Sequence, residues 1–140
     1  MASDEELKKD FQIFIDGNGI INLISMGVER RIEDINRSME IVEETLLKIF
    51  NENPEKKYKM FFDLSKMGNL RSGFSSGSRK IGARIALNKQ IEKAVVLQSS
   101  VFFKVIINFI INASGRGKIM KLFSNKEKAL GWLKNSVFKT

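Results

Sequence analysis

The last third of the chain constrains the fold more than any other stretch. A short apolar run at 94–98 is followed by a strongly apolar stretch at 101–113, a Gly-Arg-Gly turn and a second short apolar run at 119–123. Short runs between turn signals are typical of buried strands, whereas the longer stretch has the length of a helix. Ser124-Asn-Lys-Glu127 then matches a capping box that opens a helix. The sequence therefore predicts strand, helix, strand and helix, as in an α/β protein.

The first part of the chain adds a hairpin and a helix. Apolar residues alternate along 11–26 around Asp16-Gly17-Asn18-Gly19, a segment that suits the turn of a β-hairpin. Beyond Gly27 the apolar residues recur at steps of three and four, which predicts a helix over about residues 31–52. Its predicted inner face consists of Ile32, Ile35, Met39, Val42, Leu46, Ile49 and Phe50.

The middle of the chain has the pattern of a strand, a loop and a helix. The run at 58–64 is apolar and aromatic, as in a central strand, and a loop rich in serine and glycine follows over 65–78. Ser76 or Ser78 is predicted to cap the next helix. The inner face of that helix is predicted to carry Ile81, Ile85, Leu87 and Ile91. The buried side of the last helix is predicted to consist of Ala129, Leu130, Trp132, Leu133 and Val137.

These elements run in the order β-β-α-β-α-β-α-β-α. The length of 140 residues predicts one domain over residues 1–140, with 1–9 as a flexible N-terminal segment. Strands separated by helices favour a mostly parallel sheet of about five strands, flanked by about four helices. The opening hairpin predicts one antiparallel edge.

Composition excludes several classes of protein. Cysteine and histidine are both absent, which removes thiol nucleophiles, disulfides, histidine bases and the usual nitrogen and sulfur ligands of metals. The acidic residues follow no calcium-loop spacing, so we expect neither a metal site nor a cofactor. The polar, acidic N-terminus is unlike a signal peptide, and no apolar run reaches the roughly 18 residues of a membrane span. These features predict a cytoplasmic protein.

Charge is distributed unevenly along the chain. Residues 1–55 hold 6 Lys/Arg and 13 Asp/Glu, whereas residues 56–140 hold 18 Lys/Arg and 3 Asp/Glu, so the net charges of the two parts are −7 and +15. Such segregation fits a basic surface for nucleic acid or anionic lipid, and it equally fits an acidic helix packed beside basic elements. Because no arginine-rich patch with interleaved aromatics occurs, we favour internal compensation and do not expect nucleic acid as a partner.

The predicted helix at 101–113 is unusually apolar. Its polar residues, Lys104, Asn108 and Asn112, are spaced four apart and form one narrow line. A helix of this kind is either buried on most sides or presents apolar surface to a partner, and the sequence leaves both readings open. For the second reading we expect a homodimer. Its predicted contact face consists of Val101, Phe102, Ile106 and Phe109.

Several short motifs resemble a known family. Asp63-Leu64-Ser65 follows the central strand, Ala83-Arg84 lies in the next helix, and Phe123-Ser124-x-x-Glu127-x-Ala129-Leu130-x-Trp132-Leu133 leads into the last one. Over about residues 10–136 the chain resembles the small SpoIIAA-like proteins of the STAS (sulfate transporter and anti-sigma-factor antagonist) fold, which is similar in shape to the CRAL-TRIO lipid carriers. The resemblance implies a five-stranded sheet with four main helices and a non-enzymatic role in binding partner proteins.

The resemblance also implies a site in the loop before the second helix. Ser75-Ser76-Gly77 matches part of the STAS motif and places Ser75 at the position of its phospho-acceptor, although Phe74 stands where that motif has aspartate. Independently, a helix N-terminus with hydroxyl and basic side chains favours an anion, while the same serines also fit simple capping. The predicted ligand- or partner-binding residues are Phe74, Ser75, Ser76, Ser78, Arg79, Lys80 and Arg84.

Two non-catalytic functions follow from these features. The main expectation is a regulatory or protein-interaction module, in which the basic helix after the serine loop faces an acidic partner. The alternative is a carrier of a small amphiphile or lipid, with a pocket lined by the loop that holds Phe74 and by the helix at 101–113. Candidate contacts for the head group of such a ligand are Arg79, Arg84 and Lys104.

Catalysis is the least favoured function. It requires an acid, base or nucleophile with a perturbed pKa, and Asp63 and Ser65 are isolated candidates. Asp63 at the end of a strand is expected to bond nearby backbone amides instead. We therefore predict no catalytic residue and no enzymatic activity.

Overall fold

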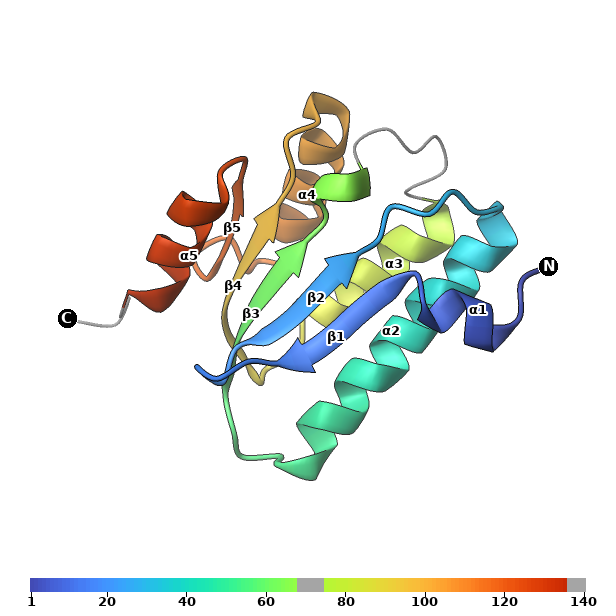
Figure 1. Cartoon of the computed structure of the whole chain (residues 1–140). Helices are drawn as coiled ribbons and strands as arrows, with labels where there is room; N and C mark the ends of the chain where they lie inside the picture. The colour runs from blue at the N-terminus through green and yellow to red at the C-terminus, as the bar shows by residue number, and fades with distance from the viewer. Residues whose placement is uncertain (68–74, 136–140) are drawn as a thin grey trace.

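The computed structural model describes residues 1–67 and 75–135, and within these ranges five strands form one mixed sheet (Figure 1). The predicted core residue Val137 and the predicted site residue Phe74 lie outside them. The strands are β1 (Phe11–Ile15), β2 (Ile21–Ser25), β3 (Tyr58–Asp63), β4 (Ile91–Leu97) and β5 (Met120–Phe123). The helices are α1 (Asp4–Lys8), α2 (Ile32–Glu52), α3 (Ser76–Ala86), α4 (Val101–Ala113), α5 (Lys126–Lys134) and the short 3-10 helix η1 (Ser65–Met67).

The order across the sheet is β1-β2-β3-β4-β5. β1 pairs antiparallel with β2, and every other neighbouring pair is parallel. The structure thus confirms the predicted α/β class and the mixed sheet with one antiparallel edge. None of the described helices is both long enough and apolar enough to span a bilayer.

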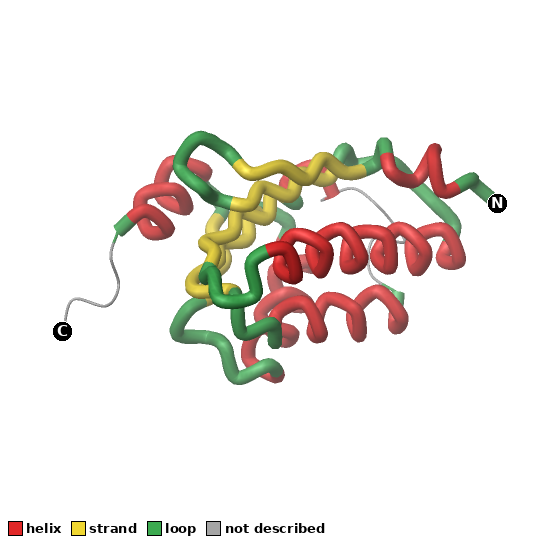
Figure 2. Tube along the Cα trace, turned by 90° about the horizontal axis from the view of Figure 1, so that it is seen from below, coloured by secondary structure: helices red, strands yellow, loops and turns green. Residues whose placement is uncertain are grey.

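Three helices cover one face of the sheet. The connections through α2, α3 and α4 each move to the next strand in the same direction. Because such crossovers have one preferred hand, all three helices lie on the same side, which Figure 2 shows below the strands. The order of the described strands does not reverse, so it offers no switch point of the kind at which open α/β sheets usually bind ligands.

The main core fills the space between this helical layer and the sheet. Most of the stripe predicted for 31–52 faces inward, whereas Ile32 at the start of α2 is exposed, and α4 contributes Phe103, Ile107 and Ile111. Each such side chain contributes about 1.5–3 kcal/mol when fully buried. Other buried members of the core are Leu23, Val42, Leu46, Phe50, Tyr58, Met60, Ile81, Ile85, Ala94, Val96 and Met120.

Helix α5 covers part of the opposite face, and a buried lysine holds its end. Ala129 and Leu133 pack against the sheet in a second, smaller core. Lys93 extends from β4, is 1% exposed, and donates hydrogen bonds to the carbonyl oxygens of Trp132 and of Asn135, the latter at 2.7 Å. A cation at a helix C-terminus satisfies free carbonyls and faces the negative end of the dipole. The half-buried Trp132 ring lies 4.1 Å from the same ammonium, so this tryptophan helps to anchor α5.

The N-caps of α3 and α5 each differ from the predicted residue by at least one position. Ser75, rather than Ser76 or Ser78, is the N-cap of α3, and Asn125, rather than Ser124, is the N-cap of α5. Both caps have extended backbone and accept a hydrogen bond from the N–H three residues ahead. Several neighbouring residues could cap each helix, so the sequence alone does not decide among them.

Two other elements differ from the prediction. Ile91 opens β4 instead of lying on the preceding helix, because α3 ends at Ala86 and Leu87 is exposed. An isoleucine fits a helix stripe and a strand equally well, so its pattern is ambiguous. Within residues 1–9, where no element was predicted, the structure has α1, and its Leu7 is buried.

The buried lysine predicts a specific pH dependence of stability. Burial, together with the positive charges of Lys59 and Lys121, lowers the pKa of Lys93 below its ordinary value of 10.5. Between the lowered pKa and 10.5 the unfolded chain binds more protons at this site than the folded chain, so the free energy of unfolding rises with pH. We expect urea unfolding between about pH 8 and about pH 10 to show a smaller rise for Lys93→Met than for the parent. Lys126→Met, at an exposed lysine, is the control, and equal rises in the parent and Lys93→Met would contradict the assignment.

Candidate functional site in a cavity between the sheet and its helices

The predicted serine site has a structural role in the folded chain. The hydroxyl of Ser75 accepts a hydrogen bond from the N–H of Ser78 at 3.0 Å and donates one to Oδ1 of Asn36 at 2.6 Å. Ser78 is buried and bonds back to the N–H and carbonyl of Ser75, whereas Ser76 is exposed. These bonds cap α3 and join it to α2. Phosphorylation of Ser75 stays a prediction, and it would break the bond to Asn36.

The predicted basic residues do not form one cluster with these serines. Arg84 makes a bidentate ion pair with Glu43 of α2, with N–O distances of 2.9 and 2.7 Å. Hydrogen bonding from Arg84 holds the pKa of Glu43 below its usual range. Arg79 and Lys80 are exposed on α3. Arg84 is therefore engaged in joining two helices and is not free for a ligand.

Asp63 behaves as the sequence suggested. Its carboxylate accepts hydrogen bonds from the backbone N–H of Ser65 at 3.1 Å and from the Ser65 hydroxyl at 2.6 Å. The pair forms a local turn cap at the end of β3. The expected bond from Asp63 to a nearby amide is confirmed.

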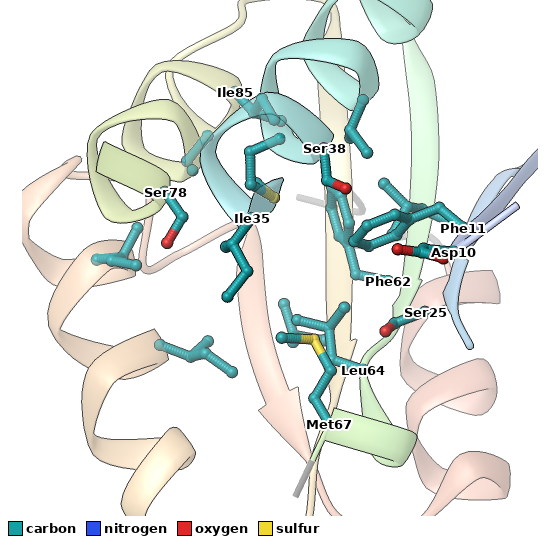
Figure 3. A pocket seen from close by; sticks show the side chains of 18 of the residues that line it. Asp10, Phe11, Ser25, Ile35, Ser38, Phe62, Leu64, Met67, Ser78 and Ile85 are labelled. Atoms are coloured by element: carbon teal, nitrogen blue, oxygen red, sulfur yellow. The ribbon is translucent and has the colours of Figure 1, made fainter. Parts of the chain in front are cut away.

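A cavity of about 150 Å³ lies between the sheet and the layer of α2, α3 and α4. In Figure 3, Phe62 and Leu64 from the β3 region lie opposite Ile35 of α2, and Ile85 of α3 closes another side. Every strand of the sheet contributes at least one residue to the lining, so the cavity lies against the inner face of the sheet. Other apolar members of the lining are Phe11, Leu23, Val42, Val96, Ile107 and Met120.

One polar side chain in this lining has no partner. Ser38 of α2 is 5% exposed, and its hydroxyl makes no hydrogen bond within the described residues. Figure 3 shows this hydroxyl on the cavity side of α2, near the ring of Phe62. Serine and threonine in helices usually bond to a carbonyl one turn back, as Thr45 of the same helix does at 2.8 Å. A buried hydroxyl without a partner costs about 1–3 kcal/mol, so this hydroxyl stays available to a molecule that enters the cavity.

The other serines of the lining are engaged. Ser25 accepts a hydrogen bond from the N–H of Gly27 at 3.2 Å, and Ser78 bonds to Ser75 as described above. At the β1 end, Asp10 is buried and accepts two hydrogen bonds from Arg30, at 2.8 and 3.0 Å. Ser38 is thus the hydrogen-bonding group of the described lining that stays available to a ligand.

The cavity reaches solvent at one end. Its lining includes Val28 and Glu29, both exposed, next to the half-buried Arg30. Asp10 and Arg30 form an ion pair on this side. A molecule that enters here meets charged side chains at the rim and then a largely apolar interior. A comparable engineered cavity of about 150 Å³ binds benzene, which sets the size of ligand that fits.

The sequence predicted a pocket lined by the loop that holds Phe74 and by the helix at 101–113. Of these, α4 contributes Ile107, Ile110 and Ile111 to the cavity, and Phe74 lies outside the described residues. Ser38 lies within the predicted inner stripe, between Ile35 and Met39, and a polar residue on that face was a usable signal. Gly82 lies in a similar way between Ile81 and Ile85 on α3. The three candidate head-group residues do not belong to the described lining; they are Arg79, Arg84 and Lys104.

The outer face of α4 keeps much of its apolar surface exposed. Val101, Phe102 and Phe109 of the predicted contact face are between 67% and 76% exposed. Ile106 instead packs against the main core, and Val105 is exposed in its place. The helix is therefore both a core element and a source of exposed apolar surface, as the two readings of the sequence allowed.

The unpartnered hydroxyl generates a prediction with a definite sign. Ser38→Ala removes a buried polar group that lacks a partner and adds a better helix former, so we expect the free energy of unfolding to rise by about 1 kcal/mol. Ser78→Ala, at another buried serine of the lining, removes part of the α3 cap and should lower the free energy of unfolding by about 1 kcal/mol. Urea denaturation measures both values. A loss of stability in Ser38→Ala would show that this hydroxyl has a bonding partner in solution.

Comparison with known proteins gives one match. A family model described as a domain of unknown function (DUF7793) matches residues 13–137. The comparisons with curated proteins and with solved structures give no match. The matched range includes α2, α3 and α4 and the strands from β2 to β5, which together form most of the cavity. Because the match covers most of the chain, this protein belongs to the DUF7793 family.

Proposed function

We propose that this protein binds a small apolar or amphiphilic molecule in the cavity beneath its sheet. The observation that carries the proposal is the free, buried hydroxyl of Ser38 in a mostly apolar lining whose other serines are engaged. Ligand sites typically combine apolar walls with a few placed polar groups, and this cavity has that composition. This function corresponds to the carrier role that the sequence offered as an alternative, with a different set of residues.

The chemistry of the lining defines the class of ligand. Asp10 and Arg30 satisfy each other, so the polar group of the ligand needs no formal charge. Ser38 can donate to a carbonyl or accept from a hydroxyl. The volume suits one aromatic ring or a short hydrocarbon chain. The expected ligand is therefore a neutral molecule with one hydrogen-bonding group, such as a simple aromatic alcohol.

A pair of glycine substitutions tests the cavity directly. A Cβ added at Gly82 would lie 3.9 Å from the Cδ1 of Ile110, so Gly82→Ala places a methyl group in the lining without a clash. A Cβ added at Gly131 of α5 meets nothing within 4 Å, and Gly131 is not part of the described lining. Each substitution should stabilise its helix by up to about 1 kcal/mol. We expect Gly82→Ala, but not Gly131→Ala, to weaken the binding of benzyl alcohol about tenfold.

The measurement is the shift in melting temperature as benzyl alcohol is titrated into the parent and the two variants. Native mass spectrometry of the parent, purified from a lipid-containing host, should in addition show a co-purified small molecule that Gly82→Ala retains less well. Equal binding by both glycine variants, or no binding by the parent, would refute the proposed site.

A second role, in protein interaction, is supported by the exposed surface of α4. The STAS resemblance implies a non-catalytic regulatory domain, and a soluble chain rarely leaves several large apolar side chains exposed on one helix. Val101, Phe102, Val105 and Phe109 are each at least 65% exposed. We propose self-association into a homodimer through this face, with the ligand cavity on the other side of α4.

Sedimentation velocity tests this second role. We expect a dimer at tens of micromolar protein, and a monomer for the double variant Phe102→Ser with Phe109→Ser, because the variant removes the exposed rings without altering the inner face of α4. Phe14→Ser, at an exposed phenylalanine of β1, is the matched control and should leave the dimer intact. A parent that sediments only as a monomer would refute self-association.

A further inference from the structure

The last strand of the sheet borders a second hollow. An open groove of about 420 Å³ lies between α4 and β5. From α4 it is lined by the polar line Lys104, Asn108 and Asn112 that the sequence shows, and from the sheet by β5 and Ser124. In Figure 1, β5 forms the edge of the sheet opposite β1. The groove thus combines a helix face with a free sheet edge.

The backbone of β5 presents hydrogen-bonding groups to this groove. The N–H of Ala94 donates to the carbonyl of Ile119 at 2.8 Å, and the N–H of Gln98 donates to the carbonyl of Phe123 at 3.0 Å. Backbone groups alternate in direction along a strand, so residues 119, 121 and 123 face β4. Leu122 and Ser124 consequently face away from β4. Because β5 is the last strand of the described sheet, no neighbouring strand covers their outward groups.

The side chains around the groove are basic or neutral. Its described lining holds no carboxylate, and residues 93–126 contain no acidic residue at all. Within the described residues, the side chains of Lys104, Asn108 and Asn112 make no hydrogen bond or ion pair. Lys121 points to the opposite face of the sheet, where its ammonium lies 5.3 Å from the centre of the Trp132 ring. Positive charge therefore flanks the free edge on both faces.

We infer that this groove binds an extended acidic peptide, which adds a strand to β5. Main-chain hydrogen bonds to Leu122 and Ser124 would hold the peptide, as in other cases of strand addition to a sheet edge. Alternate side chains of the added strand point to opposite faces. One set would meet Lys104 and the two asparagines of α4, and the other would meet Lys121. Asp or Glu at alternate positions satisfies both faces.

Charge argues against a second copy of this chain as the occupant. Two β5 edges would bring Lys104 and Lys121 of one copy close to those of the other, and like charges at a sheet edge disfavour pairing. The acidic residues of the described chain lie largely in α1, α2 and turns, and not in an extended segment with acids at alternate positions. The expected partner is a different protein with an acidic extended segment.

A peptide selection on the intact chain tests the inference. A random dodecapeptide library displayed on phage is selected against the immobilised protein, and the enriched peptides are synthesised for fluorescence anisotropy. We expect them to carry Asp or Glu at alternate positions. Lys104→Glu should weaken their binding about tenfold, whereas Lys48→Glu, at an exposed lysine of α2, makes the same charge change away from the groove and should leave it unchanged.

A second pair of variants tests the backbone contact. Ser124 is exposed, so replacing it leaves the core intact. Ser124→Pro removes the outward N–H and should weaken peptide binding about fivefold. Ser124→Ala keeps that N–H and should leave peptide binding unchanged. Hydrogen exchange should show protection of the Leu122 amide when peptide is bound. Enriched peptides that lack acidic residues, or that bind Lys104→Glu and Ser124→Pro as tightly as the parent, would overturn the inference.

Discussion

The preferred hand of the strand-helix-strand connection is the constraint on which the rest of this structure depends. Three successive connections advance across the sheet in one direction, so α2, α3 and α4 all lie on one face. That face has to be filled by side chains from three helices and five strands at once. The cavity lies where the side chains of these elements do not fill the space between them. On the opposite face, α5 is the described helix that packs against the sheet. The position of the candidate site under the helices thus follows from topology before any functional residue is considered.

The same arrangement explains why α4 has three different sides. As the outermost helix of the layer, it has a neighbour on one flank only, α3, where Ile110 approaches Gly82. Phe103 and Ile107 face the core, Lys104 faces the groove beside β5, and Phe109 is exposed. A helix in the middle of the layer could not combine these roles. The two readings of the apolar sequence, core helix and interaction surface, are therefore compatible: one side of the helix is buried and another side has exposed apolar surface.

Local pattern predicted the elements well because their causes are local. The hairpin turn forms because the Asp16 carboxylate accepts the N–H groups of Asn18 and Ile20, all within five residues. The cap of α3 depended on more distant contacts, since the hydroxyl that caps the helix also bonds to Asn36 of α2. The cavity is harder still to predict, because its small volume depends on how eight helices and strands pack together. Ser38 was visible as a polar residue on an apolar face, yet its lack of a partner is a property of the fold and not of the sequence.

The uneven charge of the chain is resolved only in part by the fold. The pairs of Arg30 with Asp10 and of Arg37 with Asp4 join residues within the acidic first part. Among ion pairs between described residues, Arg84 with Glu43 is the one that joins the basic part to the acidic part. Exposed pairs of this kind contribute at most about 1 kcal/mol, so compensation is neither extensive nor strongly stabilising. Most of the positive charge of the second part is therefore exposed to solvent or available to a partner. In the acid-free groove beside β5, this positive charge lies next to free backbone groups.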